Sequence, residues 1–159
     1  MAESNFTLTA LNGQPLYGRV WSPARPKAVI ALIHGLGEHS GRYTHVAAEF
    51  NHSGYAVLAC DLPGHGKTAG PRGVTPPFDQ LSESCAGLLA EAEQRYPGKP
   101  RFLYGHSLGG TIVLYYTIRR NPQIAGVVST SPALRLGGNP QRAKVAFGKL
   151  VGRLAPNIV

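Results

Sequence analysis

Residues 102–110 read Phe-Leu-Tyr-Gly-His-Ser-Leu-Gly-Gly, and this stretch decides the fold. Its first three residues form an apolar run that predicts a strand, and the periodicity of residues 108–121 predicts a helix. Between them, Gly105 to Gly109 fits the pattern G-x-S-x-G. The pattern alone is weak evidence, because a chain with 20 glycines matches it easily by chance. A nucleophile elbow requires this setting between a strand and a helix, so we predict that Ser107 is the attacking residue.

The segments around this stretch alternate between predicted strands and helices. An opening hairpin is indicated by Asn12-Gly13, which lies between two strand-like segments, Phe6 to Thr9 and Leu16 to Trp21. Further apolar runs, typical of strands buried on both faces of a parallel sheet, lie at residues 28–33, 56–60, 102–104 and 126–129. Helical periodicity marks residues 44–53, 78–96 and 108–121. Strands that alternate with helices form right-handed crossovers, so we predict an α/β three-layer sandwich with a mostly parallel sheet.

The composition is that of an ordinary globular chain. The 159 residues suffice for one domain, and 43% of them are hydrophobic while 15% are charged. No apolar run approaches the roughly 20 residues of a membrane-spanning helix, and the polar opening does not resemble a secretory signal. We therefore predict a cytoplasmic protein. Cys60 and Cys85 lack metal-type spacing, so we expect two buried free thiols.

The net charge of +8 is distributed unevenly along the chain. Lysines and arginines nearly balance the acidic residues up to Ser107, whereas no Asp, Glu or His follows it within the 159 residues. Because protein surfaces normally mix both signs of charge, we expect a balancing segment outside this sequence. The basic residues are not interleaved with aromatic ones in any recognisable module, which argues against a nucleic-acid partner.

A second motif, residues 34–37, follows the first buried strand and reads His-Gly-Leu-Gly. Its glycines let the backbone fold beneath the nucleophile, as in an oxyanion loop. A tetrahedral intermediate needs two preorganised N–H donors, and we predict the backbone amides of Leu36 and Leu108 for this role. We expect both amides to converge about 3 Å from Ser107 Oγ. Glu38, His39, Arg42 and Tyr43 follow this loop, and they either cap and start the helix from Thr44, which we favour, or contact the substrate.

Three ordered motifs carry a family resemblance: His34 begins H-G-L-G-E-H-S-G-R-Y, Asp61 begins D-L-P-G-H-G, and Gly105 begins G-H-S-L-G-G. Together they resemble the monoacylglycerol lipase and lysophospholipase branch of the α/β-hydrolases, the serine aminopeptidase S33-type hydrolases. The resemblance implies a serine carboxylic ester hydrolase that cleaves lipid-like esters, such as monoacylglycerols or lysophospholipids, through an acyl-enzyme on Ser107. It implies neither a cofactor nor a metal.

The same resemblance divides the chain into two parts. Residues 1–130 correspond to the N-terminal part of the α/β-hydrolase core, and residues 131–159 correspond to the start of the cap, or lid. Within the second part, residues 143–154 show an apolar helical stripe beside a basic one. We interpret this segment as a helix packed on its own domain, with membrane contact or a cover over the substrate as the alternative.

The triad of this family needs an acid and a base beyond the nucleophile. Its members supply an Asp and then a His after the cap, and we expect this sequence to be truncated within the cap region. All six histidines precede Ser107, so we expect no histidine nitrogen within about 3.2 Å of Ser107 Oγ. We interpret His34, His65 and Asp61 as residues that hold loops together.

Two functions therefore remain open for the 159 residues. One is a serine ester hydrolase that is inactive alone and is completed by a complementary C-terminal half, or by a second copy that covers the open sheet edge. The other is a noncatalytic remnant that binds an acyl ligand or a partner protein. Labelling by a fluorophosphonate probe discriminates between them, since a nucleophile without a base reacts slowly.

Overall fold

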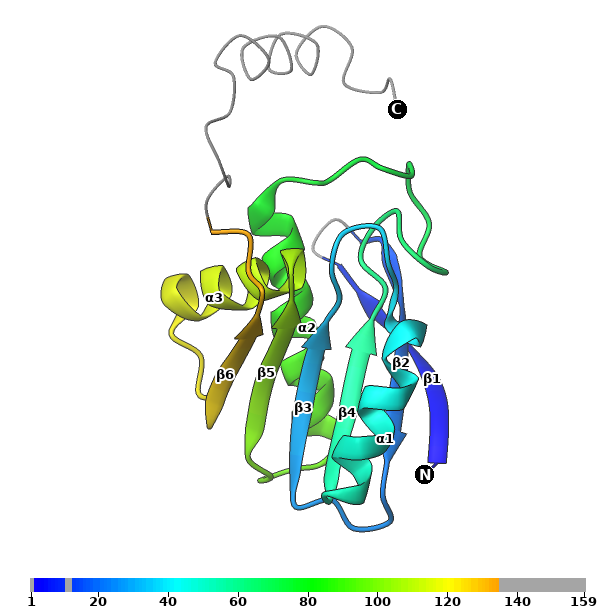
Figure 1. The fold of residues 1–159 in the computed structure, drawn as a ribbon, viewed down its shortest axis with the longest axis vertical. Coiled ribbons are helices and arrows are strands. Elements are labelled where there is room, and N and C mark those ends of the chain that lie inside the picture. The colour runs from blue at the N-terminus through cyan, green and yellow to red at the C-terminus, as the bar shows by residue number, and fades with distance from the viewer. Residues whose placement is uncertain (1, 11–12, 135–159) are drawn as a thin grey trace, which may run out of the picture.

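The computed structural model describes residues 2–10 and 13–134, and six strands of this part form one sheet (Figure 1). The strands are β1 (Ala2–Thr9), β2 (Pro15–Ser22), β3 (Ala28–Ile33), β4 (Tyr55–Cys60), β5 (Arg101–His106) and β6 (Gly126–Thr130). Their order across the sheet is β1-β2-β4-β3-β5-β6. The pairs among β4, β3, β5 and β6 are parallel, and β2 runs antiparallel to β1 and β4. The sheet is mostly parallel, as predicted.

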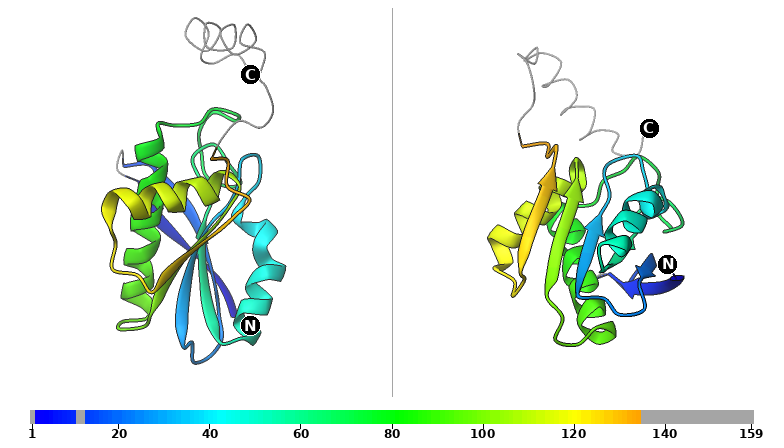
Figure 2. Two further views of the ribbon diagram at one scale, coloured as in Figure 1. Left: turned by 60° about the vertical axis from the view of Figure 1, so that its left-hand side comes forward. Right: turned by 60° about the horizontal axis from the view of Figure 1, so that its bottom comes forward.

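Helices cover both faces of this sheet. They are α1 (Thr44–His52), which follows a 3-10 turn at Ser40–Tyr43, α2 (Phe78–Arg95) and α3 (Leu108–Arg120). Figure 2 shows α1 on one face and both α2 and α3 on the other. The predicted three-layer sandwich is therefore confirmed.

The hairpin that opens the chain is also confirmed. The N–H of Ala10 donates to the carbonyl of Gln14 at 2.8 Å, and β1 and β2 pair from Thr9 opposite Pro15 outward. Gly13 has φ +80°, a left-handed conformation that favours glycine at this turn. Both strands extend beyond the predicted segments, because the ladder continues to the pair Ala2 and Ser22.

The core consists of two apolar layers, one on each face of the sheet. The layer under α2 and α3 contains Val29 and Ile33 of β3, and the layer under α1 contains Ile30 and Leu32 of the same strand. Successive side chains of a strand point to opposite faces, so β3 needs apolar residues at every position. All six residues of β3 are buried, which confirms the prediction from its continuous apolar run.

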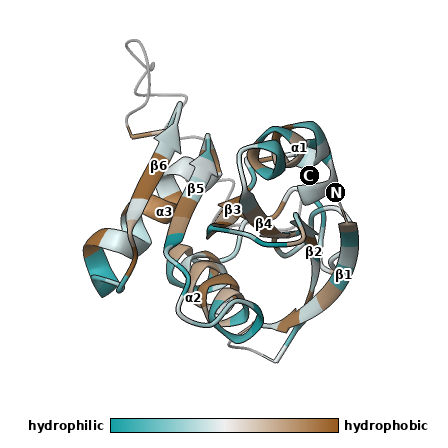
Figure 3. Cartoon of the chain, turned by 90° about the horizontal axis from the view of Figure 1, so that it is seen from below, coloured by the Kyte–Doolittle hydropathy of each residue, from teal (hydrophilic) through white to brown (hydrophobic). Residues whose placement is uncertain are grey.

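The prediction that β6 is buried on both faces is wrong. None of its five residues is fully buried, and Val128 is 49% exposed. Within the described residues β6 has one neighbouring strand, and α3 packs against it. Figure 3 shows the hydrophobic segment of β6 at this edge of the sheet. On the α1 side, an apolar groove of about 250 Å³ is lined by Ile30, Phe50, Tyr55, Phe102, Leu103, Tyr104 and Val128.

Two further predictions concern buried thiols and the cap. Cys60 and Cys85 are buried free thiols, and burial raises the pKa of the Cys60 thiol to about 12.

Residues 135–159, with the predicted helical stripe at 143–154, lie outside the described residues, so the cap assignment stays a prediction. Among the helices that the structure describes, none combines the length and hydropathy needed to span a bilayer.

Candidate active site

Ser107 occupies a strained turn between a strand and a helix. β5 ends at His106 and α3 begins at Leu108, so the serine alone makes the turn, with φ 52° and ψ −117°. A residue with a side chain pays about 1–3 kcal/mol for such a conformation, and it persists only where the surroundings impose it. The Ser107 N–H donates to the Thr130 carbonyl at 2.9 Å, and the Ser107 carbonyl accepts from Thr111 N–H at 3.1 Å. This is the geometry of the predicted nucleophile elbow.

The glycines on either side of Ser107 are required by close backbone approach. A Cβ on Gly105 would overlap the carbonyl group of Gly109. A Cβ on Gly109 would overlap the carbonyl oxygen of Ile33, the last residue of β3. Any side chain at either position would therefore push α3 away from the ends of β5 and β3. The G-x-S-x-G pattern thus has a steric cause in this fold.

The loop after β3 lies directly against this elbow. A Cβ on Gly35 would come within 3.2 Å of the Ser107 Cβ and 3.3 Å of the His106 carbonyl oxygen. Among the hydrogen bonds of the described residues, none uses the N–H of Leu36 or of Leu108. Within the described part of the chain, both amides therefore lack a protein acceptor. Their convergence on one point near Ser107 Oγ stays a prediction.

Glu38 holds this loop in place. Its carboxylate accepts the N–H of Gly35 at 2.5 Å and the hydroxyl of Tyr43 at 2.6 Å. Burial raises the pKa of Glu38, but the hydrogen bonds from Tyr43 and Gly35 and the nearby His34 and His106 lower it overall. Burial of Tyr43 and its hydrogen bond to Glu38 raise the pKa of Tyr43 well above its usual range. An ionised carboxylate and a protonated phenol thus support each other.

The contacts of Glu38 agree with the structural use favoured for it, but Glu38 is not a helix cap. Neither the 3-10 turn nor α1 has a side-chain cap, and the carboxylate reaches back to the loop instead. An acidic residue three positions after a glycine is the only sequence signal of this contact. Such a spacing is common, so the sequence alone does not single it out.

His34 is a buried structural residue. Its Nε2 accepts the N–H of Leu62 at 3.0 Å, so the ring proton lies on Nδ1, which donates to the Gly35 carbonyl at 2.7 Å. Burial lowers the pKa of His34 to about 4, outweighing its hydrogen bond to Gly35. A neutral ring with both nitrogens occupied cannot serve as a general base. This agrees with the loop-holding role expected from the sequence.

Asp61 anchors the loop after β4. Its Oδ1 accepts the N–H and the hydroxyl of Ser40 at 2.7 and 2.6 Å, and its Oδ2 accepts the N–H of Lys67 at 2.8 Å. The Thr68 hydroxyl donates to the Asp61 carbonyl at 2.7 Å, and His65 Nδ1 donates to the Pro63 carbonyl at 2.9 Å. Asp61 therefore joins the loop after β4 to the 3-10 turn beside the oxyanion loop. The structural role predicted for Asp61 and His65 matches these contacts.

The partners of the histidines bear on the question of the base. In the part of the chain that the structure describes, no hydrogen bond joins a histidine nitrogen to Ser107 Oγ. His106, the neighbour of the serine in the chain, contacts Thr130 Oγ1 through its Nδ1 at 3.0 Å. This agrees with the expectation that these histidines do not activate Ser107. Thr130 was missed in the sequence, where the predicted strand ends at residue 129.

A groove of about 450 Å³ lies beside the oxyanion loop. It is lined by Leu36, Gly37, Glu38 and His39 from that loop and by Gly64, His65, Gly66, Arg72 and Gly73 from the loop after β4. Arg72 closes the second wall, because its guanidinium donates to the carbonyls of Gly64 and Gly66 at 3.1 and 2.9 Å. The groove provides a concave surface next to Leu36, whose side chain is 61% exposed.

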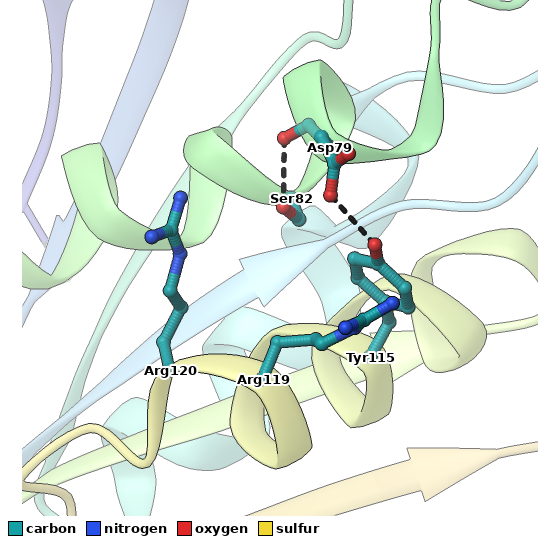
Figure 4. A pocket seen from close by; sticks show the side chains of 5 residues that line it. All are labelled: Asp79, Ser82, Tyr115, Arg119 and Arg120. Carbon is teal, nitrogen blue, oxygen red and sulfur yellow. Dashed lines mark hydrogen bonds between the residues drawn. The ribbon is translucent and has the colours of Figure 1, made fainter.

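A separate pocket of about 370 Å³ lies between α2 and α3 and is lined by Asp79, Ser82, Tyr115, Arg119 and Arg120. Figure 4 shows the Tyr115 hydroxyl donating to the Asp79 carboxylate at 2.6 Å and the Ser82 hydroxyl donating to the Asp79 carbonyl at 2.7 Å. Arg119 lies over the Tyr115 ring, and Arg120 pairs with Glu83. We interpret this pocket as a polar contact region between two helices, because each of its lining side chains has a partner in α2 or α3.

Comparisons with known proteins indicate the family to which this chain belongs. A family model described as serine aminopeptidase, S33, matches residues 24–159. A monoacylglycerol lipase of Mycolicibacterium smegmatis is 35% identical over 98% of this chain, and the human monoglyceride lipase is 37% identical over 95%. The chain spans 56% and 50% of their lengths. The crystal structure of a Paleococcus ferrophilus monoacylglycerol lipase matches 90% of this chain and 53% of its own, with 38% identity and a TM-score of 0.75.

Proposed function

Because the chain belongs to the serine aminopeptidase S33 family of α/β-hydrolases, we propose that it carries the nucleophile of a carboxylic ester hydrolase. The observation that carries this proposal is the strained Ser107 with the Gly35 backbone packed against it. A serine held at such a backbone conformation has no evident structural use, whereas a nucleophile gains exposure and orientation from it. The relatives are lipases by name, which supports a lipid-like ester as the substrate.

The proposed reaction has two halves. Ser107 Oγ loses its proton to a base and attacks the ester carbonyl, whose electron pair moves onto the oxygen. The amides of Leu36 and Leu108 donate to that oxyanion, and the alcohol leaves with a proton to give an acyl-enzyme. Water then attacks the acyl group, which releases the carboxylic acid and returns the proton to Ser107. The dipole of α3, which begins at Leu108, adds to the stabilisation of negative charge.

The substrate is proposed to be a monoacylglycerol or a lysophospholipid. The groove between the oxyanion loop and the loop after β4 adjoins Leu36, so it offers room for one side of such an ester. Family members acting on these esters need no cofactor, and the proposed steps use none. Membrane contact through residues 131–159 and a cytoplasmic location remain predictions from the sequence.

The proposed reaction needs a base, which is expected to come from outside the described residues. The partner it requires is a complementary segment with an Asp and a His that also covers the β6 edge, either as a separate half or as part of a longer protein. The alternative is a noncatalytic remnant that binds an acyl ligand. The exposed apolar groove beside β6 supports this second candidate, because a ligand could occupy it without any chemistry at Ser107.

The test is the hydrolysis of a short-chain nitrophenyl ester. We expect only trace turnover by residues 1–159 alone, because loss of the histidine costs subtilisin about a millionfold. Adding the complementary half of a homologous hydrolase should restore turnover, and Ser107→Ala should abolish it. Full turnover by the unmixed chain that is lost in Ser107→Ala would show that a base within these residues has been missed. Turnover that survives Ser107→Ala would contradict the proposal itself.

A further inference from the structure

Thr130 makes polar contacts with three consecutive residues of the elbow. It is the last residue of β6 and lies opposite His106 in the parallel ladder. Its carbonyl accepts the Ser107 N–H at 2.9 Å, its hydroxyl donates to the Gly105 carbonyl at 3.3 Å, and the same oxygen lies 3.0 Å from His106 Nδ1. One residue of the neighbouring strand thus contacts each position of the turn up to the nucleophile.

The Thr130 hydroxyl lies between two polar groups of the elbow. A threonine hydroxyl has one proton and can also accept, whereas a backbone carbonyl such as that of Gly105 can only accept. The proton goes either to the Gly105 carbonyl at 3.3 Å, with His106 Nδ1 as the donor to the hydroxyl oxygen, or to an unprotonated His106 Nδ1 at 3.0 Å. The Tyr104 hydroxyl lies 3.4 Å from the same oxygen. In either arrangement, Thr130 Oγ1 fixes the orientation of the His106 ring.

We propose that Thr130 is the positioning residue of the nucleophile elbow, holding the Gly105 carbonyl, the His106 ring and the Ser107 amide in one arrangement. The proposal rests on the proposed function, since it assumes that Ser107 is the nucleophile. The elbow needs such support because its backbone conformation is unfavourable for serine. The first turn of α3 also packs closely on Thr130, because a Cβ on Gly110 would lie 3.2 Å from the Thr130 carbonyl oxygen.

The test compares Thr130→Val with Thr130→Ser. Valine has nearly the shape of threonine and keeps the backbone carbonyl, so it removes only the hydroxyl contacts with Gly105 and His106. Serine keeps the hydroxyl and should restore wild-type behaviour. Thr117→Val is the matched control, because the Thr117 hydroxyl donates to the Val113 carbonyl within α3, away from the elbow.

Two measurements on the 159-residue chain report on positioning without needing catalysis. The ¹⁵N chemical shifts and tautomer populations of His106 should change in Thr130→Val, because Nδ1 loses its hydroxyl partner. Hydrogen exchange of the Ser107 amide should become about tenfold faster in Thr130→Val, because the loss of the hydroxyl contacts lets the turn open more often although the Ser107 N–H keeps its bond to the Thr130 carbonyl. Thr130→Ser and Thr117→Val should leave both unchanged.

The third measurement is the rate at which a fluorophosphonate probe labels Ser107, with imidazole added as a base. Labelling should slow about tenfold in Thr130→Val and stay at the wild-type rate in Thr117→Val. Unchanged exchange and tautomer in Thr130→Val, or equal effects in Thr117→Val, would overturn the proposal. A wild-type chain whose labelling is no faster than that of Ser107→Ala would instead refute the proposed function, and exchange and tautomer would still decide the role of Thr130.

Discussion

The strands β3 and β6 were both predicted to be buried on both faces, yet their surroundings are opposite. Every residue of β3 is buried, whereas no residue of β6 is fully buried. β3 lies between two strands with helices packed over both faces, while β6, among the described residues, has one neighbouring strand and α3. Burial is therefore set by place in the sheet rather than by local sequence. The candidate site lies between these two environments, since the loop of residues 34–37 follows β3 and Thr130 ends β6.

The largest expected effect on stability is at Gly109 in α3, and Gly87 in α2 provides the comparison. Gly109→Ala should cost more than about 3 kcal/mol, because its Cβ would overlap the carbonyl oxygen of Ile33 and backbone cannot move aside cheaply. Gly87→Ala, inside α2, should instead stabilise the protein by about 0.5–1 kcal/mol, since its Cβ would meet only the Leu8 side chain at 3.6 Å. Urea denaturation measures both changes. Equal effects would show that the elbow is not tightly packed on β3.

The buried His34, which follows β3, should also make the stability of the protein sensitive to acid. The pKa of His34 is about 4 in the fold, against 6.5 when unfolded, so the unfolded state binds more protons between these values. The stabilisation is complete above pH 6.5 and is lost as the pH falls toward 4, by up to about 3 kcal/mol.

The measurement is the free energy of unfolding as a function of pH. His34→Gln should flatten the decline between pH 6.5 and 4, whereas His52→Gln should leave it as in the wild type, because the His52 side chain is 80% exposed. A decline that is equally steep in His34→Gln would assign the acid sensitivity to other groups.

The smallest effect tests the two environments directly with one chemical change. Val57→Ala, in the buried strand β4, should destabilise the protein by about 2 kcal/mol through lost burial and a cavity. Val128→Ala, at the exposed edge, should change the stability by less than about 0.5 kcal/mol. Thermal unfolding of both variants provides the comparison. A large loss in Val128→Ala would mean that something covers β6 in solution.

The sequence predicted those parts of the molecule that depend on local patterns. The alternation of apolar runs and helical periodicity was enough for the sandwich, and the setting of residues 105–109 was enough to place Ser107 at a turn between a strand and a helix. Asp61 was also interpreted correctly as a loop anchor, because a carboxylate before a Pro-Gly turn has an obvious structural use.

Features that depend on contacts across the sheet could not be predicted. The exposure of Val128 depends on which strands and helices reach β6, and its own sequence is that of a buried strand. The contact between Thr130 and the elbow requires the β5 and β6 register, which places residue 130 opposite residue 106. The contact between Glu38 and Gly35 could not be predicted for a similar reason, since the loop and not helical spacing brings the two residues together.

Chemical modification of the two buried thiols reports how often this fold opens. Only a thiolate reacts readily with an alkylating reagent, and both cysteines are fully enclosed with pKa values raised by burial. Modification must therefore wait until the layer between β4 and α2 separates long enough to admit the reagent and water. The labelling rate at Cys60 and Cys85 consequently reports how often this layer opens, a frequency that no static contact reveals.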